Sequence, residues 1–296
     1  MYQLISDGGC DFSKDEAMKY NIGIVPFYIC MNDETYLKEG IDISKDDYFQ
    51  QLASEKSFFP KTAQPNPQDY IDAYTPHLEK GKDVLVLTIS SKLSGSHNSA
   101  ELAADILKDD FPDRTIIVID SLSASVGQGL ILGEMIKMRN AGYSMRQTKE
   151  LVKEIISTTK VYFTLDSLEY LKRGGRIGSA TALVGGILGL RPILQLEDGQ
   201  VSQLNRVRGK KNAHKIIRET IADALKDNLE CINIRIGHVL SESDAVDFKS
   251  GTEATFETQI TNPITEIGAA IGTHAGPGAL GFAICRKFDA ISKVAA

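Results

Sequence analysis

The side chains best suited to binding an anion are concentrated in four short polar turns. Each turn combines hydroxyl, imidazole or guanidinium groups with glycine or proline. The turns are residues 62–67 (TAQPNP), 90–97 (SSKLSGSH), 171–178 (LKRGGRIG) and 272–278 (GTHAGPG). Hydroxyls, backbone amides and the positive end of a helix can together accept an anion. These residues therefore predict recognition of a carboxylate or phosphate.

The turn at residues 90–97 directly follows an apolar run, residues 83–89, that predicts a buried strand. A strand-to-helix turn of this kind opens into the crevice where open α/β sheets bind ligands. Ser94 is a candidate anion ligand, and it also suits the N-cap of the following helix. Thr62 either faces a cleft or belongs to the capping of a helix that begins at Pro67.

Two of the turns contain a charged or titratable side chain. Arg176 follows paired glycines that permit close backbone approach, and its planar guanidinium fits a carboxylate or phosphate. A solvated surface loop is the alternative for this charged run. His274 lies between glycines in a predicted loop, where a neutral imidazole can donate to a carboxylate. A purely structural histidine is the alternative there.

Common enzyme and metal signatures are absent from the sequence. It has no G-x-x-x-x-G-K-[ST] phosphate loop, no H-E-x-x-H and no G-x-S-x-G. Gly127, Gly129 and Gly133 depart from the dinucleotide fingerprint in their spacing, and we interpret them as glycines at a close helix–sheet contact. The four cysteines form no C-x-x-C pair. We expect a reduced, cytoplasmic protein without a cofactor or metal.

Composition narrows the class of protein further. The chain has 296 residues, of which 42% are hydrophobic and 24% charged, and its formal net charge is −6. These values predict a folded protein of about two domains without a basic surface for nucleic acid. The first residues lack the basic lead of a secretion signal. No apolar run approaches the ~20 residues of a membrane-spanning helix.

The elements that must position the turns alternate between strand and helix in the first half. Four apolar segments are predicted strands: residues 2–6, 23–31, 83–89 and 115–119. Four other segments are predicted helices: residues 67–80, 94–108, 123–139 and 144–157. This alternation is typical of a parallel sheet covered by helices, and Pro26 places the second strand near an edge.

The second half predicts a mixed sheet. Its predicted strands are residues 161–165, 192–196, 201–207 and 231–238, with a last strand near the C-terminal end. Asp198-Gly199 marks a hairpin tip, residues 210–225 a helix, and residues 174–189 a glycine-rich passage. We place a domain boundary near residue 160, so that residues 1–160 and 161–296 form two α/β domains.

Six segments, taken in order, resemble the motifs of the DegV family. Its patterns are D-[ST]-x-x-D, T-x-Q-P-[ST]-P, S-S-x-L-S-G-[ST], D-[ST]-x-x-x-S-x-G-x-G, L-x-x-[GR]-G-R and G-x-H-x-G-P-G. The matching segments are residues 7–11, 62–67, 90–96, 120–129, 171–176 and 272–278. Gly8 replaces the hydroxyl residue of the first pattern, so residue 8 has no side chain that could form a hydrogen bond. Asn66 replaces the Ser/Thr of the second pattern, and both residue types cap helices.

The resemblance implies two α/β domains with a long-chain fatty acid in a buried tunnel between and within them. It further implies that a separate ATP-binding kinase subunit phosphorylates the presented carboxylate, giving an acyl phosphate for bacterial phospholipid synthesis. The residues that it places at the carboxylate are Thr62, Ser94, Gly95, Arg176 and His274. Those that it places on a partner-facing surface are Arg173, Arg206 and Arg208.

Two other functions remain open on the sequence. With Ser94 as nucleophile and His274 as base, the protein would be an esterase or thioesterase, but the sequence has no nucleophile elbow and no evident Asp partner for His274. A lipid-responsive regulatory protein would need only the binding site. Burial of a long acyl chain would favour fatty-acid binding, because each buried methylene contributes about 0.8 kcal/mol.

Overall fold

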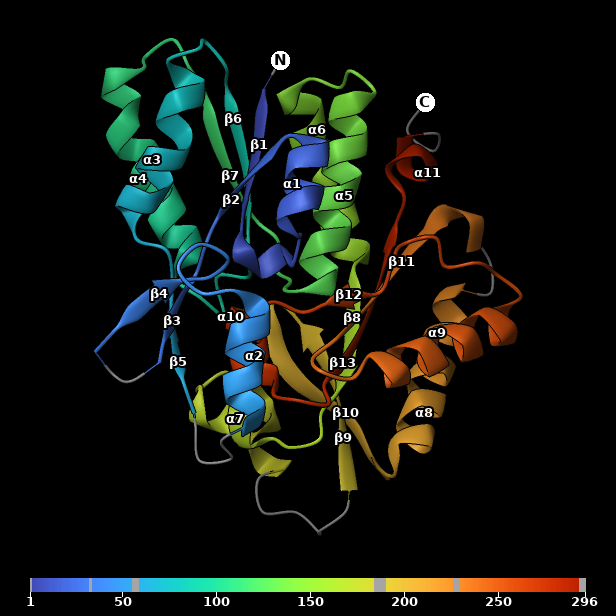
Figure 1. Cartoon of the computed structure of the whole chain (residues 1–296). Coiled ribbons are helices and arrows are strands. Elements are labelled where there is room, and N and C mark those ends of the chain that lie inside the picture. Colours follow the sequence, from blue (N-terminus) through green and yellow to red (C-terminus); the bar gives the residue numbers. More distant parts are fainter. Residues whose placement is uncertain (1, 32–33, 55–58, 184–189, 226–228, 293–296) are drawn as a thin grey trace.

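The computed structural model describes residues 2–31, 34–54, 59–183, 190–225 and 229–292. Within these ranges the strands form a four-stranded, a six-stranded and a three-stranded sheet (Figure 1). The first two sheets confirm the predicted fold class: a parallel sheet flanked by helices, followed by a mixed α/β arrangement.

The four-stranded sheet is parallel and has the order β2-β1-β6-β7. Its strands are β1 (Gln3–Asp7), β2 (Ile22–Val25), β6 (Val84–Thr88) and β7 (Ile116–Asp120). Every residue of β1 and β6 is buried, as continuous apolar runs between two helical layers predict. Figure 1 shows α3 (Pro67–Leu78) and α4 (Ser96–Asp110) on one side of this sheet. On the other side lie α1 (Lys14–Tyr20), α5 (Val126–Asn140) and α6 (Met145–Thr158).

The six-stranded sheet is mixed, with the order β10-β9-β8-β13-β11-β12. Its strands are β8 (Lys160–Thr164), β9 (Leu190–Glu197), β10 (Gln200–Arg208), β11 (Ile232–His238), β12 (Thr265–Glu266) and β13 (Leu280–Arg286). Asp198 and Gly199 both have positive φ angles of 48° and 79°, which confirms the predicted hairpin tip between β9 and β10. Helices α8 (Lys210–Leu225) and α9 (Glu242–Phe256) pack on this sheet (Figure 1).

Helix α5 joins the cores of the two large sheets. Its residues Val126 and Leu130 share one hydrophobic cluster with Leu85 of β6 and Ala283 of β13. At Gly127 a Cβ atom would collide with Val161, and at Gly129 it would lie 2.8 Å from the carbonyl oxygen of Cys10. The interpretation as sites of close helix packing is therefore confirmed for Gly127 and Gly129 and is wrong for Gly133, where a Cβ atom would meet nothing within 4 Å.

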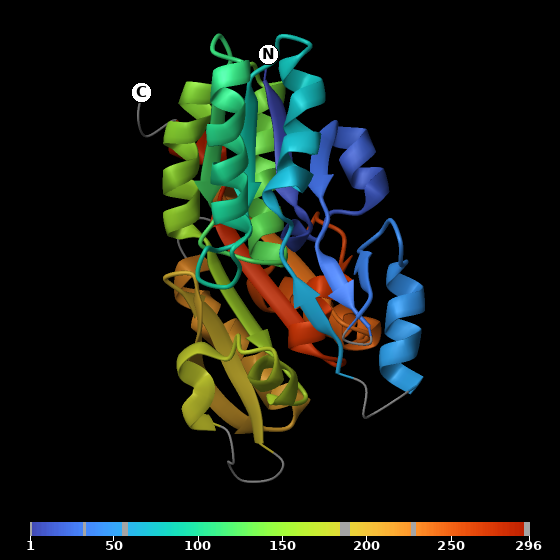
Figure 2. The same cartoon turned by 90° about the vertical axis from the view of Figure 1, so that its left-hand side faces the viewer.

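A three-stranded antiparallel sheet corrects one prediction. Residues 23–31 do not form a single strand: β2 ends at Val25, and β3 (Tyr28–Cys30) belongs to another sheet with β4 (Tyr36–Lys38) and β5 (Lys61–Ala63). Pro26, which has a fixed φ and no N–H, lies at the break. Figure 2 shows this sheet and α2 (Lys45–Ser54) beside the part of the molecule that contains the six-stranded sheet.

The small sheet and α2 share a core with the second half of the chain. Phe27, Ile29 and Tyr48 lie in one hydrophobic cluster with Leu165 and Ala270. Two short helices of the second half, α7 (Glu169–Arg173) and α10 (Ala269–Ala275), take part in this region. The division into residues 1–160 and 161–296 stays a prediction.

Several helix starts differ from the predicted ones. Helix α4 begins at Ser96 with Gly95, not Ser94, as its N-cap, and α5 begins at Val126 because Leu122 and Ser125 have positive φ. Asn66 and Ser144 each form a capping box, which confirms Ser144 as an N-cap. The remaining elements are η1 (Gly8–Cys10), η2 (Gly178–Leu183), η3 (Leu229–Cys231) and α11 (Phe288–Ser292). Residues 184–189 of the glycine-rich passage lie outside the described ranges.

The sequence also predicts that no segment spans a membrane and that the cysteines are reduced. No helix in the described part of the chain has the length and apolar character needed to cross a bilayer. Cys10, Cys30 and Cys285 are buried, Cys231 is partly exposed, and all four are free thiols.

Candidate functional site

A cavity lies between the six-stranded sheet, strand β5 of the small sheet and the segments that follow β6 and precede α5. Its empty space is about 970 Å³, part of it open to solvent. Most of its walls are aliphatic or aromatic, including Phe27 before β3, Val161 and Phe163 of β8, and Ile267. Such walls suit an apolar ligand.

Four of the five predicted anion ligands line this one cavity. Thr62 comes from β5, Ser94 from the turn before α4, Arg176 from the segment after α7, and His274 from α10. Gly95 lies beside them, where a Cβ atom would collide with the side chain of Gln64, which also lines the cavity. Tertiary folding thus brings all four polar turns to one place.

The Thr62–His274 pair has an unused hydrogen-bond donor. Thr62 Oγ1 and His274 Nε2 are 2.8 Å apart, and buried His274 Nδ1 has no partner in the described residues. If the hydroxyl donates to Nε2, the proton is on Nδ1 and lacks an acceptor. If Nε2–H donates instead, the hydroxyl hydrogen is free. In either tautomer of a neutral imidazole, the pair has one donor without a partner in the described residues. When Nε2–H donates, this donor is the Thr62 hydroxyl, which lines the cavity.

Burial keeps the imidazole uncharged. Desolvation lowers the pKa of His274 to about 4, and the positive charge of Arg176 contributes in the same direction. Gly174 makes this burial possible, because a Cβ atom there would overlap the His274 ring. His274 lies in the last full turn of α10, so its prediction as a loop residue was wrong. Near neutral pH the site presents a neutral imidazole.

Ser94 and Arg176 complete the polar part of the cavity. Ser94 Oγ accepts a hydrogen bond from the Ser96 amide at 3.2 Å, so its hydroxyl hydrogen can be donated to another group. Arg176 donates from Nε to the carbonyl oxygen of Leu93 at 3.1 Å and from Nη1 to that of Gly174 at 2.6 Å. Its exposed guanidinium therefore joins the Ser94 turn to the glycine that accommodates His274.

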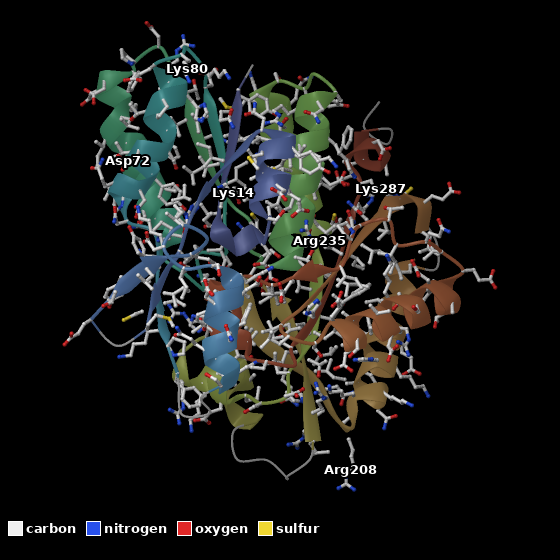
Figure 3. All side chains as sticks on the ribbon, in the orientation of Figure 1. Lys14, Asp72, Lys80, Arg208, Arg235 and Lys287 are labelled. Atoms are coloured by element: carbon white, nitrogen blue, oxygen red, sulfur yellow. The ribbon has the colours of Figure 1, made fainter. Side chains whose placement is uncertain are left out.

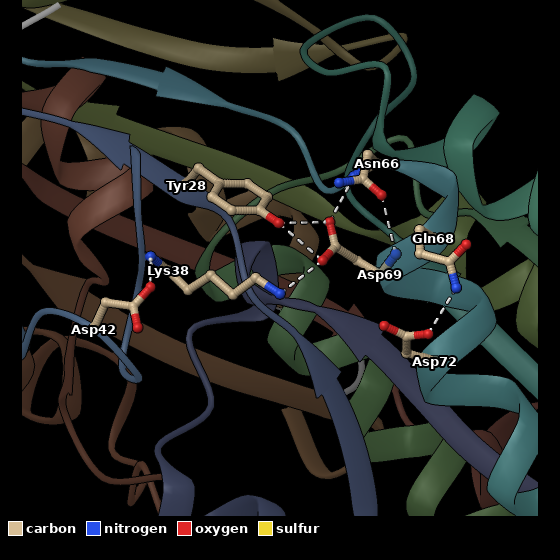
Figure 4. Close-up of polar contacts among 7 residues, drawn as sticks. All are labelled: Tyr28, Lys38, Asp42, Asn66, Gln68, Asp69 and Asp72. Carbon is tan, nitrogen blue, oxygen red and sulfur yellow. Dashed lines mark hydrogen bonds and ion pairs between the residues drawn. The ribbon is translucent and has the colours of Figure 1, made fainter. Parts of the chain in front are cut away.

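A polar cluster fixes the strand that carries Thr62 (Figure 4). Asp69 of α3 accepts hydrogen bonds from Tyr28 of β3 at 2.9 Å and from Lys38 of β4 at 2.8 Å. Burial alone would raise the pKa of Asp69, but the bonds from Lys38 and the Asn66 amide outweigh it and lower the pKa. Because β5 pairs with β3 and leads directly into α3, this cluster restrains Thr62 from both sides.

Two buried carboxylates hold the opposite end of α10. Asp11 Oδ1 accepts from the Gly268 amide at 2.9 Å and Oδ2 from the Ser125 hydroxyl at 2.5 Å. Glu39 accepts from the Ala269 amide, and the Ala270 amide also acts on its carboxylate. Its buried Oε2 atom meets the distance and angle criteria for a hydrogen bond with no partner among the described residues. A Cβ at Gly8 would lie 3.6 Å from this Oε2 atom. The glycine that departs from the family pattern therefore faces this carboxylate oxygen.

These carboxylates make stability depend on pH. Burial, followed by repulsion from Asp11, raises the pKa of Glu39 from 4.5 to about 7, and burial raises that of Asp11 to about 6. Lys45 and Arg235 are the cations that act on the pair. Since the native state holds the Glu39 proton more tightly than the unfolded chain, its contribution to stability falls as pH rises from about 4.5 to 7.

We expect Glu39→Gln, which mimics the protonated acid, to match the wild type in stability at pH 5. At pH 8 we expect the variant to be more stable by on the order of 2 kcal/mol. Urea denaturation at both pH values measures this, with exposed Glu79→Gln as the matched control. A stability difference between Glu39→Gln and wild type that is the same at both pH values would contradict the assignment.

The predicted partner-facing arginines lie outside the cavity lining. Arg173 pairs with Glu169 at 2.7 Å and lies over the Phe59 ring. Arg206 and Arg208 are exposed on β10, and Figure 3 shows Arg208 at the far end of the molecule from Lys80. Arg206 and Arg208 thus lie on exposed β10, whereas Arg173 adjoins Gly174, the residue that packs against His274. The role of all three arginines stays a prediction.

Sequence reasoning missed two contributors to the site. Gln64 lies within the quoted 62–67 turn but had no role assigned to it, although its place two residues after Thr62 on an extended segment is a usable signal. Glu39 has no sequence signal, because its contacts to Ala269 and Asp11 arise only through tertiary folding. Groups of three or more His, Cys, Asp or Glu arranged to hold a metal ion do not occur among the described residues.

Fold and site together define an α/β protein with a cavity whose shape and lining suit a largely apolar molecule with a polar end. Comparison with known proteins agrees with this class. The model of the family described as "Uncharacterised protein, DegV family" matches residues 1–287. The chain therefore belongs to the DegV family, as its motifs predicted.

Individual relatives extend over the whole chain. A DegV domain-containing protein of Clostridium perfringens is 32% identical over 285 residues, covering 96% of this chain and 99% of that protein. A stearic acid-binding protein from Eubacterium ventriosum superposes with a TM-score of 0.93 at 30% identity, covering 98% and 100%. A fatty-acid-binding DegV protein from Thermus thermophilus gives 0.87 at 31% identity, covering 96% and 99%.

Proposed function

We propose that this protein binds a long-chain fatty acid in the cavity, with the carboxylate at Thr62, Ser94 and His274 and with Gly95 and Arg176 beside it. The observation that carries the proposal is the unused donor of the Thr62–His274 pair at the polar part of an otherwise apolar cavity. The relatives described as binding stearic acid and fatty acids support the same ligand class.

The energetics favour such a ligand. Each buried methylene contributes about 0.8 kcal/mol, so a long acyl chain offsets the ordering and association costs of binding. A carboxylate without partners would lose several kcal/mol in this environment. The hydroxyls of Thr62 and Ser94 and the imidazole of His274 supply donors, and Arg176 supplies positive charge from the exposed side.

We further propose that the bound carboxylate is presented to a separate ATP-dependent kinase subunit, which converts it to an acyl phosphate. The motif resemblance supports this step, and the absence of a phosphate loop from the sequence means that the partner must supply the ATP site. Carboxylate held mainly by neutral donors stays nucleophilic, because it is not neutralised by several arginines. Arg173, Arg206 and Arg208 are the proposed partner-facing residues, and the two predicted domains enclose the ligand.

The alternative of a serine hydrolase is less well supported by the geometry. His274 Nε2 is paired with Thr62, and Nδ1 has no carboxylate partner among the described residues. A pKa of about 4 also makes His274 a weak general base near neutral pH. Hydrolysis of a chromogenic ester that Ser94→Ala abolishes would establish the alternative instead.

Lipid extraction tests the binding proposal directly. We expect mass spectrometry of protein purified from bacteria to show a long-chain fatty acid in near-stoichiometric amount, and delipidated protein to rebind it. Recovery of no fatty acid, together with no binding in titration, would refute the proposal.

The kinase step has a separate test. Fatty-acid-loaded protein, incubated with ATP and a candidate kinase subunit, should give an acyl phosphate that hydroxylamine traps as a hydroxamate. A loaded protein that never yields hydroxamate would leave the binding role standing and remove the presentation role.

A further inference from the structure

Two glycines face each other in the six-stranded sheet. Gly237 of β11 and Gly281 of β13 are register partners in an antiparallel pair. Glycine in the interior of a strand weakens it and often marks a place where a ligand or another segment approaches closely. The packing around the two glycines differs: the space beside Gly237 is filled, whereas that beside Gly281 is open.

Gly237 is explained by the protein's own packing. A Cβ atom there would lie 2.6 Å from Cγ1 of Val126 and 3.1 Å from Cγ1 of Ile267. The space above Gly237 is therefore occupied by the first residue of α5 and by the residue that follows β12. A side chain at Gly237 would displace them.

Gly281 has no such explanation. A Cβ atom there would meet Val126 Cγ2 at 3.5 Å, the Gly237 carbonyl oxygen at 3.9 Å and Ile267 Cδ1 at 4.0 Å, all ordinary contact distances. Its φ angle is not among the positive ones, so the backbone does not require glycine. Gly281 lines the cavity, and the volume that its side chain would fill belongs to the cavity.

This volume lies on a different wall from the carboxylate ligands. The neighbours of Gly281 are Val126, Gly237 and Ile267, whereas His274 contacts Thr62 and Gly174. On its other side Gly281 pairs with Phe163 of β8, a further cavity residue. The surroundings of Gly281 within the cavity are apolar and suit alkyl carbon.

We propose that Gly281 is a specificity-determining residue that leaves room for acyl carbons remote from the carboxylate, and so sets how long a chain the cavity accepts. This inference rests on the proposed fatty-acid binding. A larger residue at this position fills part of the cavity beside the six-stranded sheet and leaves the Thr62–His274 pair unchanged. Long acyl chains then lose the buried contacts that their last carbons make at this position. Short chains do not reach it and are unaffected.

The test compares dissociation constants for saturated fatty acids from decanoate to stearate. For Gly281→Val we expect stearate to bind about tenfold more weakly, the burial of one to two methylenes, with decanoate unchanged. Gly281→Ala should give a smaller shift in the same direction, and it remains available if the valine variant does not fold. Circular dichroism and thermal unfolding check the fold of both variants.

Gly133→Ala is the control, because a Cβ there meets nothing within 4 Å and Gly133 is absent from the cavity lining. A stearate-to-decanoate ratio that stays the same in wild type, Gly281→Ala and Gly281→Val would overturn the inference. Wild-type protein that binds none of the acids would overturn the proposed function instead, so the two failures are distinguishable.

Discussion

Replacing Asp7 by alanine is expected to lower the free energy of unfolding by about 3–5 kcal/mol, because it breaks a buried hydrogen-bond network. The fully buried carboxylate accepts four hydrogen bonds. Oδ1 accepts from the Gly9 amide at 3.1 Å and from Gln128 Nε2 at 2.9 Å, and Oδ2 accepts from the Ile89 amide at 3.0 Å and from Ser96 Oγ at 2.7 Å. Alanine leaves the Gly9 and Ile89 amides without this acceptor, whereas Gln128 and Ser96 also contact Ser6 and Tyr70. Each unsatisfied group costs about 1–3 kcal/mol before relaxation.

The same substitution should loosen the site, because Asp7 joins the end of β1 to the start of α4, next to Ser94. Asp7→Asn keeps the shape and one carbonyl oxygen, so we expect a smaller loss than with alanine. Exposed Asp105→Ala on α4 is the matched control and should stay within about 0.5 kcal/mol of wild type. Urea denaturation measures all three. An Asp7→Ala protein as stable as the Asp105→Ala control would show that these hydrogen bonds do not support the fold.

The second large effect is on ligand affinity. We expect Ser94→Ala and His274→Ala each to weaken fatty-acid binding by about 1–3 kcal/mol, which is roughly 5- to 150-fold in Kd. The double variant should lose more than either single one. Ser94→Ala removes a hydroxyl from the cavity lining, and His274→Ala removes the imidazole that pairs with Thr62. Displacement of a fluorescent fatty acid measures the result.

Two further proteins make this test specific. Ser91→Ala alters an exposed hydroxyl of the same turn that does not line the cavity, and it should bind as the wild type does. Gly174→Ala should mimic His274→Ala: its φ of −72° tolerates a side chain, but the added methyl displaces the imidazole. Wild-type affinity in both Ser94→Ala and His274→Ala would remove the proposed carboxylate site while leaving open binding elsewhere.

Long apolar runs were the most reliable guide to the fold. Residues 83–89 and 115–119 became β6 and β7 with boundaries shifted by only a residue. Central β6 is buried on both faces and needs apolar side chains in succession, whereas edge strand β7 is only partly buried. Residues 23–31 show the limit of this reasoning. Their composition suits a strand throughout, but Pro26 divides them between two sheets whose partner strands lie elsewhere in the chain.

For the candidate site, too, the sequence predicted the residues but not their local structure. Hydroxyl, guanidinium and imidazole groups beside glycines identified Thr62, Ser94, Arg176 and His274, and all four line one cavity. The pattern around His274 predicted a loop, because three glycines within seven residues disfavour a helix. Helix α10 forms there nonetheless: Asp11 and Glu39 accept hydrogen bonds at its first turn, and packing leaves room only for glycine at Gly272, where a Cβ would lie 2.7 Å from Phe49.

The sequence by itself determined the α/β class, the order of most elements, the family and the kinds of group available to hold an anion. Local patterns carry that information, because backbone preference and burial act over a few residues at a time. Only the tertiary structure decided that Glu39 meets Asp11 beneath α10, that the Thr62–His274 pair has a spare donor, and that the space at Gly281 stays open while that at Gly237 is filled. These features depend on distances between segments remote in the chain, and such distances are set by the packing of the whole molecule.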